Sequence, residues 1–284
     1  KLDEILKMLS PDVNLVIVYG QDQYLDKSRD DLKALANLML QLGKVGQSGN
    51  GLILIRDYAN AQGLLDMGVD SRYLPGYGTG RIERFSKLWN VNMEEIFKPV
   101  DIMKMLRSKK IKALLIFGEN PLLSNAAQKL FQGLEFVLLL DFFRTATAEE
   151  ADVVLPASTP LESEGTFTAC DRRVQRSKVL FPPKSGFSNR EIITTLAEKL
   201  AMPLQLESAA DIFKEIQQAN SFYQTIASDV FWGKDLFRVN FHTVNGKGKF
   251  SPLTIDLATC NLEKQNLLAS ETYLQLKIKN KLMV

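Results

Sequence analysis

The sequence predicts an α/β fold: a doubly wound, mainly parallel sheet with helices on both faces. Three observations support it. Several short runs are apolar throughout, as in parallel strands buried on both faces. Segments with helical spacing alternate with these runs. Three of the apolar runs are followed directly by Gly or Asp. Strands that alternate with helices are typical of a parallel sheet, whose ligands bind beyond the carboxyl ends of the strands.

Five apolar runs are the strand candidates. They cover residues 14–19, 52–55, 112–117, 136–140 and 153–155. Between the first two runs, apolar residues from Leu32 to Leu42 fall at helical spacing, and Gly43 and Gly46 end that segment. Shorter helices are expected at 125–131 and 147–151. Together these elements predict an α/β dinucleotide-binding-like domain over residues 1–189.

A different pattern begins after residue 189. Amphipathic helices are expected from Ile192 to Leu200 and around Ile212 to Ile216. The run 237–250 alternates apolar and polar residues around Asn245-Gly246, which is a hairpin turn signal. Residues 190–284 are therefore predicted to form a helical appendage and a β-hairpin that leads towards a C-terminal barrel lying outside the sequence.

Composition limits the classes of partner. The chain has 284 residues, 45% of them hydrophobic and 24% charged, with a formal net charge of +2. These are values of an ordinary globular protein, and they give no nucleic-acid footprint. No apolar run approaches the roughly 20 residues that span a bilayer. We expect no nucleic-acid partner, no direct membrane insertion, and a cytoplasmic location with any membrane association made through partner subunits. The first residue, Lys1, is not Met, which is typical of a fragment.

The residues that could bind a metal are few. Cys170 and Cys260 are the only cysteines and His242 is the only histidine. An iron–sulfur cluster generally needs four cysteines, or two cysteines with two histidines, and structural zinc has similar demands. We therefore expect no metal site in this chain.

Residues 151–176, reading ADVVLPASTPLESEGTFTACDRRVQR, closely resemble a segment of the prokaryotic molybdopterin oxidoreductases. This superfamily contains the formate dehydrogenase α subunit and the G subunit of NADH–quinone oxidoreductase. Further similar runs are Asn60-Ala-Gln-Gly63 with Asp66-Met-Gly68, Leu74-Pro-Gly-Tyr77, Gly118-Glu-Asn-Pro121 and Asp141-Phe-Phe143. The resemblance implies the domain that binds molybdopterin guanine dinucleotide, with the iron–sulfur clusters and the molybdenum ligand in other domains.

The resemblance also implies a set of cofactor-binding positions and no catalytic residue. The positions are Gly20, Arg56, Gly118, Asn120, Ser124, Asp141, Thr145 and Thr147. Gly20, Arg56, Gly118 and Asp141 each follow or close a predicted strand, so we expect those four residues to share one edge of the sheet.

Three departures from the family pattern bear on the cofactor. Asp57 and Tyr58 stand where molybdenum enzymes have Gly and Gln beside the pterin. Leu140 replaces the Gln expected before Asp141, and residues 21–23 lack a second close-approach glycine. A carboxylate repels a pyrophosphate, and a leucine cannot hydrogen-bond a guanine. These changes indicate a retained fold whose cofactor has been lost.

Two main hypotheses follow. The first is a structural, cofactor-free domain of a redox subunit resembling the G subunit of NADH–quinone oxidoreductase, which would scaffold electron transfer by iron–sulfur clusters elsewhere. The alternative is a fragment of a molybdenum-dependent formate dehydrogenase α subunit that binds molybdopterin guanine dinucleotide. A free-standing guanine-nucleotide module is a third. In the first two, the partners are other domains and subunits of a redox complex.

The acidic pair Glu162 and Glu164 follows the fifth strand candidate. Two nearby carboxylates can act as an acid and a base. Because they are expected on a surface loop, we interpret them instead as partners of Arg172, Arg173 or Arg176 that order the loop.

Overall fold

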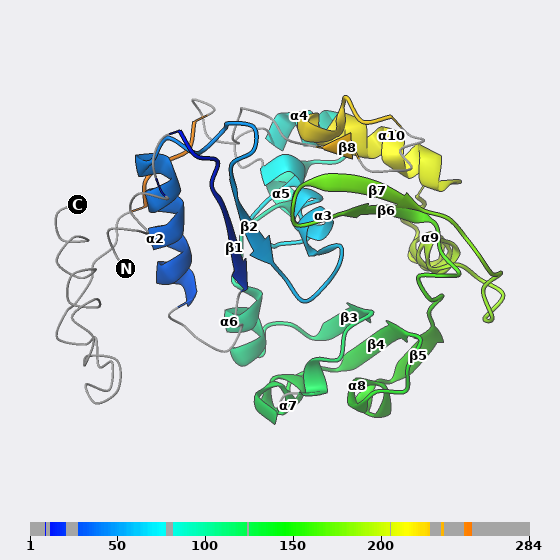
Figure 1. Cartoon of the computed structure of the whole chain (residues 1–284). Helices are drawn as coiled ribbons and strands as arrows, with labels where there is room; N and C mark the ends of the chain where they lie inside the picture. The colour runs from blue at the N-terminus through cyan, green and yellow to red at the C-terminus, as the bar shows by residue number, and fades with distance from the viewer. Residues whose placement is uncertain are drawn as a thin grey trace. The chain divides into compact units, whose positions relative to one another are not determined.

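The computed structural model describes residues 9, 12–20, 28–77, 82–123, 125–204, 206–227, 234–235 and 247–251. It divides into two compact units: Lys1–Asp57 with Arg238–Val284, and Tyr58–Phe237. Figure 1 shows the elements of each. The turn of the predicted hairpin, Ser124, His242 and Cys260 lie outside the described residues, as do residues 21–23.

The first unit contains one strand–helix–strand crossover. Strand β1 (Val16–Gly20) pairs in parallel with β2 (Gly51–Ile55), and α2 (Ser28–Gln41) connects them. Met39 of α2 is almost fully buried. Gly43 follows the helix with φ of 66°, a left-handed conformation that glycine adopts without strain. The predicted strands and the helix between them are confirmed here.

The second unit contains a three-stranded parallel sheet in the order β3–β4–β5. The strands are β3 (Ala113–Phe117), β4 (Phe136–Asp141) and β5 (Val153–Pro156). Helices α7 (Asn125–Phe131) and α8 (Ala146–Glu150) lie in the two connections. Ile116, Val137 and Leu139 form the core of one face, against Phe131 of α7 and Ala148 of α8. The carboxyl ends of all three strands therefore open at one edge.

Short helices precede this sheet. They are α3 (Ala61–Asp66), η1 (Pro75–Tyr77), α4 (Ile82–Trp89), α5 (Met93–Ile96) and α6 (Ile102–Arg107), and η2 (Pro121–Leu123) follows β3. Leu74, Phe85 and Met93 pack together with Ala219. This small core joins the first helices of the unit to a helix far along the chain.

An antiparallel sheet follows in the order β6–β7–β8. Its strands are β6 (Gly165–Thr168), β7 (Arg173–Ser177) and β8 (Lys234–Asp235). Helices α9 (Asn189–Lys199), α10 (Ala209–Ala219) and η3 (Ser221–Tyr223) lie between β7 and β8 in sequence. Val174 is fully buried against Phe213, Tyr223 and Ile226. The sequence predicted both long helices but not this sheet.

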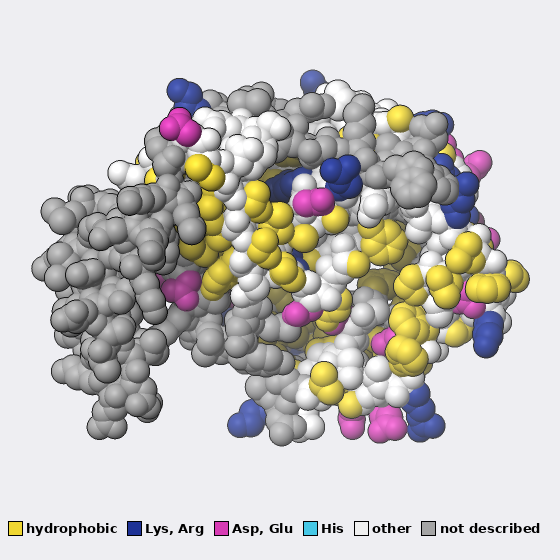
Figure 2. All heavy atoms as spheres, viewed as in Figure 1, with side chains coloured by type: hydrophobic (Ala, Val, Ile, Leu, Met, Phe, Trp, Pro, Cys, Tyr) yellow, Lys and Arg dark blue, Asp and Glu magenta, His cyan; other side chains and the backbone are white. Residues whose placement is uncertain are grey.

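The α/β fold class with parallel sheets is confirmed, and every pairing among β1 to β5 is parallel. These strands form two hydrogen-bonded groups, one in each unit. That all five share one sheet edge remains a prediction, as does a domain division after residue 189. Many large apolar side chains stay exposed, as Figure 2 shows; Leu180, Phe181 and Phe187 are each more than half exposed.

Candidate functional site

Gly118 lies at the carboxyl end of β3, where the resemblance predicts close approach to a cofactor. Its φ is 64°, and its N–H donates to the carbonyl of Leu140 on the neighbouring strand (2.8 Å). A Cβ at this position would meet no atom within 4 Å. The backbone conformation, rather than crowding, therefore favours glycine here.

Asn120 and Thr147 hydrogen-bond to each other beside this edge. The Oδ1 atom of Asn120 accepts from the N–H (3.2 Å) and the hydroxyl (2.8 Å) of Thr147. The Thr147 hydroxyl also accepts from the N–H of Leu122 (3.2 Å), and Thr147 is fully buried. Thr145 caps α8 by accepting from the N–H of Ala148 (3.3 Å). The bonds of Asn120 and Thr147 thus join the turn after β3, together with η2, to α8.

Two carboxylates belong to the same edge. Asp141 is 8% exposed, and its Oδ1 atom accepts from the N–H groups of Phe142 (2.7 Å) and Phe143 (3.1 Å). Glu119 accepts from the hydroxyl of Tyr58 (3.2 Å). The edge thus carries negative charge, and Asp141 fixes the turn that follows β4.

A cavity of about 210 Å³ opens beside these residues. Its lining residues are Phe117, Gly118, Leu140, Phe142, Ala157, Ser158, Asn189 and Ile193. Ser158 and Asn189 hydrogen-bond to each other, from the N–H of Ser158 to Oδ1 of Asn189 (2.7 Å) and from Nδ2 of Asn189 to the carbonyl of Ser158 (3.1 Å). The remaining surface is mostly apolar, and none of these lining residues is Lys or Arg.

A second cluster surrounds Asp66, which is fully buried. Its Oδ1 atom accepts from Nε2 of Gln62 (2.8 Å), the hydroxyl of Tyr77 (2.8 Å) and Nη1 of Arg172 (3.3 Å). Its Oδ2 atom accepts from the hydroxyl of Tyr223 (3.0 Å). Sequence reasoning did not identify this cluster, although all of its residues except Tyr223 lie in the runs that carry the resemblance.

The two tyrosines of this cluster stay protonated and act as donors. Burial, with the neighbouring Asp66 carboxylate, raises the pKa of Tyr77 to about 12. The same causes, burial first, raise the pKa of Tyr223 well above its usual range. The Tyr223 hydroxyl also contacts that of Thr168 (2.6 Å). The cluster therefore joins α3, η1 and η3 to the antiparallel sheet.

Comparisons with known proteins agree with these motifs. The sequence model of the molybdopterin oxidoreductase family matches residues 5–199. The chain belongs to the molybdopterin oxidoreductase family. It is 35% identical over 251 residues to the F420-dependent formate dehydrogenase subunit alpha of Methanocaldococcus jannaschii, covering 79% of this chain and 37% of that protein.

Two further relatives of this molybdopterin oxidoreductase family chain come from Bacillus subtilis and Escherichia coli. The probable oxidoreductase YjgC of Bacillus subtilis is 33% identical, over 82% of this chain and 24% of that protein. Formate dehydrogenase H of Escherichia coli is 29% identical, over 78% of this chain and 35% of that protein. The chain thus spans between about a quarter and just over a third of the length of these relatives.

The family's dinucleotide cofactor fits the described edge poorly. A guanine needs hydrogen-bond partners along its polar edge, and a pyrophosphate needs cations or free N–H groups. At this edge Asn120, Thr145 and Thr147 are engaged with the protein, and Leu140, which cannot hydrogen-bond a base, lines the cavity. The carboxylates of Glu119 and Asp141 would repel a pyrophosphate. Gly20 ends β1 and Arg56 follows β2, and both residues belong to the other unit.

The interpretation of the acidic pair is right for one residue and wrong for the other. Glu164 contacts Arg176 (3.4 Å), as predicted. Glu162 is 8% exposed and instead accepts from the N–H groups of Thr159 (2.9 Å) and Lys184 (3.2 Å). The backbone hydrogen bond from Thr159 is the main cause that lowers the pKa of Glu162. Glu162 holds two loop segments together and pairs with no arginine in the described part of the chain.

The remaining arginines have other partners. Arg172 binds Asp66, and Arg173 lies 3.6 Å from Asp171. Within the described part of the chain, no group of three His, Cys, Asp or Glu side chains could hold a metal ion. None of the helices described there is long and apolar enough to cross a membrane.

Proposed function

We propose that this chain is a cofactor-free structural domain of a redox subunit in the molybdopterin oxidoreductase family. One observation carries the proposal: at the carboxyl edge of β3–β5, the predicted cofactor-binding side chains hydrogen-bond to the protein itself, beside two carboxylates. A site for a dinucleotide would instead present open donors and positive charge.

This proposal combines one element of each redox hypothesis: the descent from one and the cofactor-free condition from the other. The curated relatives favour descent from formate dehydrogenase α subunits. The edge favours the cofactor-free condition for which the G subunit of NADH–quinone oxidoreductase is the family example. The α/β part over residues 1–189 would scaffold an electron path through iron–sulfur clusters in other domains. Its partners would be those domains and other subunits of a cytoplasmic redox complex.

Calorimetric titration of the 284-residue chain with GMP and GDP tests the proposal. We expect binding no tighter than about 1 mM. An acidic edge facing a diphosphate and a guanine edge unpaired against Leu140 each cost roughly 1–3 kcal/mol. Because about 1.4 kcal/mol is tenfold in affinity, the two losses together weaken binding at least about 30-fold.

A variant that restores the residues of the molybdenum enzymes at three positions is the comparison for this titration. The triple change Asp57→Gly, Tyr58→Gln and Leu140→Gln should tighten GDP binding relative to the unchanged chain. Micromolar binding by the unchanged chain that Ser124→Ala weakens, while the exposed Ser221→Ala does not, would contradict the proposal. It would instead support the alternative, a formate dehydrogenase fragment that binds molybdopterin guanine dinucleotide.

A further inference from the structure

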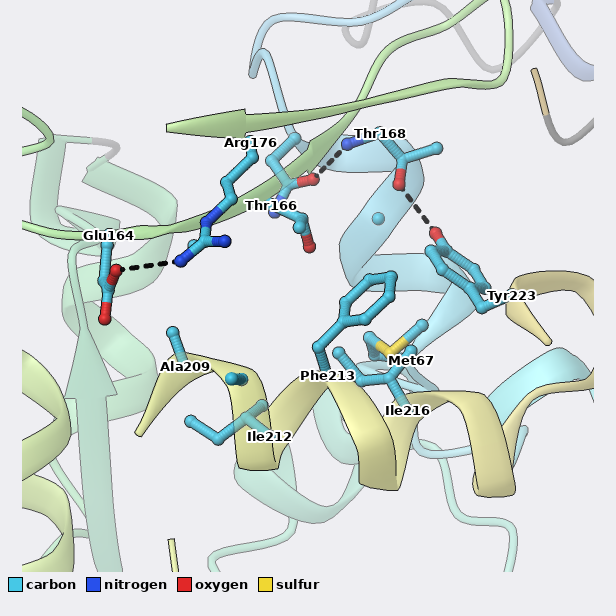
Figure 3. Close-up of a pocket in the computed structure, with 14 residues that line it drawn as sticks. Met67, Glu164, Thr166, Thr168, Arg176, Ala209, Ile212, Phe213, Ile216 and Tyr223 are labelled. Carbon is cyan, nitrogen blue, oxygen red and sulfur yellow. Dashed lines mark hydrogen bonds and ion pairs between the residues drawn. The ribbon is translucent and has the colours of Figure 1, made fainter. Parts of the chain in front are cut away.

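A second cavity, of about 250 Å³, lies within the second unit between α3, the β6–β7 hairpin and α10 (Figure 3). One side is apolar, with Met67 directly after α3 and Ile212, Phe213 and Ile216 from α10. The other side is polar and comes from Asn60 and the hairpin. An apolar wall facing a few polar groups is typical of small-molecule sites, and this volume suits a compact molecule.

Four lining residues, Gly63, Gly165, Ala209 and Ala210, are small. Packing explains Gly63, because a Cβ there would lie 2.1 Å from Oδ1 of Asn60. Packing does not explain Gly165, where a Cβ would meet no atom within 4 Å. Its backbone does not have a positive φ, so conformation does not require glycine either. The space in front of Gly165 is therefore open in the described structure.

Two polar groups at the cavity have no hydrogen-bond partner among the residues that the structure describes. Figure 3 shows the Thr166 hydroxyl pointing into the cavity, and no hydrogen bond joins it to the described residues. Oδ1 of Asn60 accepts from the N–H of Thr168 (2.9 Å), whereas its Nδ2 group donates to none of the described residues. Among the described residues no buried side-chain N or O atom lacks a hydrogen-bond partner, so both groups are open to water. Each can therefore donate to an acceptor atom of a ligand in place of water.

The charges at the cavity balance. Arg176 and Glu164 form an ion pair at 3.4 Å, with side chains 29% and 41% exposed. No other lining residue is charged. A charged ligand would therefore bring an uncompensated charge against the apolar wall of α10, which is unfavourable.

We propose that this cavity binds a compact, uncharged aromatic compound with one carbonyl oxygen. The ring would pack against Phe213, Ile212 and Met67. The carbonyl oxygen would accept from the Thr166 hydroxyl and from Nδ2 of Asn60. This inference goes beyond the proposed scaffold function and does not rest on it, because the cavity is separate from the lining of the β3–β5 edge.

The first experiment titrates the 284-residue chain, with isotope-labelled Ile and Met methyl groups, with benzamide and follows the spectrum by NMR. We expect the methyl signals of Met67, Ile212 and Ile216 to shift, with a dissociation constant of about 0.1–1 mM, as befits so small a ligand. Benzoate and benzylamine, which carry opposite charges, should bind about tenfold more weakly or worse. No shift at those methyl groups, or tighter binding of a charged analogue, overturns the proposal.

Variants assign the binding to this cavity. Thr166→Val removes the hydroxyl at nearly constant shape and should weaken benzamide binding about fivefold, whereas Thr166→Ser should keep it. Thr194→Val is the matched control, because its hydroxyl binds the Arg190 carbonyl in its own helix and lies outside the lining. Ala210→Leu fills the space and should abolish binding. Each variant is first checked for an unchanged dispersed spectrum.

Two results would overturn the assignment even with all variants folded. Unchanged benzamide binding in Ala210→Leu would place the ligand elsewhere. Much tighter binding of N-acetylphenylalaninamide at the same methyl groups would show that the cavity accepts a side chain of a protein segment instead of a free small molecule.

Discussion

The β3–β5 edge and the cavity under the β6–β7 hairpin differ in what their polar atoms do. At the edge, Asn120 and Thr147 bind each other and Asp141 binds its own turn. At the cavity, the Thr166 hydroxyl and Nδ2 of Asn60 have no described protein partner. The family resemblance predicted the binding positions at the edge. The side-chain donors without a described protein partner, however, lie at the cavity. Position in a conserved fold therefore does not by itself show where a chain binds.

The largest effect should come from Asp66, which supports the wall of the cavity. Asp66→Ala leaves the hydroxyls of Tyr77 and Tyr223 without their buried acceptor and Arg172 without its buried ion-pair partner. Removing one partner of a buried polar cluster costs about 3–5 kcal/mol. Urea unfolding should show that loss in the free energy of unfolding.

The control for this change is Glu83→Ala, at an exposed position of α4. It should alter the free energy of unfolding by less than about 0.5 kcal/mol. If Asp66→Ala lowered the free energy of unfolding as little as this control, the Asp66 cluster would not be what stabilises the region around the cavity.

A smaller effect is expected at the edge. Asn120→Ala removes the acceptor for the N–H and the hydroxyl of the buried Thr147, at a cost of about 1–3 kcal/mol. Asn92 precedes α5 without a side-chain cap bond, so Asn92→Ala should cost less. If Asn120→Ala instead left stability unchanged and altered GDP binding, Asn120 would serve a ligand and the contrast between the two regions would fail.

The sequence predicted local elements better than sites. Continuous apolar runs such as 136–140 mark buried strands, and helical spacing marked α9 and α10. The antiparallel sheet was missed because β6 and β7 are short and polar, with one central residue, Val174, fully buried. The Asp66 cluster joins residues up to 157 positions apart, and no local pattern reports such pairing.

Glu162, in the segment that leads from β5 to β6, should make the stability of the chain depend on pH. Its pKa is lowered in the folded chain, so its stabilisation is fully present above the ordinary glutamate pKa and is lost as pH falls through the folded value. Urea unfolding from about pH 6 to about pH 3 should show the unchanged chain losing more stability than Glu162→Gln. Parallel curves would mean that its backbone hydrogen bonds do not favour the ionised form.

The smallest effect on stability should come from Glu164 at the mouth of the cavity. Its single 3.4 Å contact with Arg176 is partly exposed, and such pairs contribute about 0–1 kcal/mol, less at high salt. Glu164→Gln should therefore barely change urea unfolding. It should nevertheless change ligand choice, because the variant removes a carboxylate at the cavity that repels an anionic ligand. We expect benzoate to gain about threefold to tenfold in affinity relative to benzamide. Glu83→Gln, which also removes one carboxylate from the surface, should leave that ratio unchanged. An unchanged ratio in Glu164→Gln would mean that the ion pair does not face the ligand, and the preference for an uncharged compound would lose its physical basis.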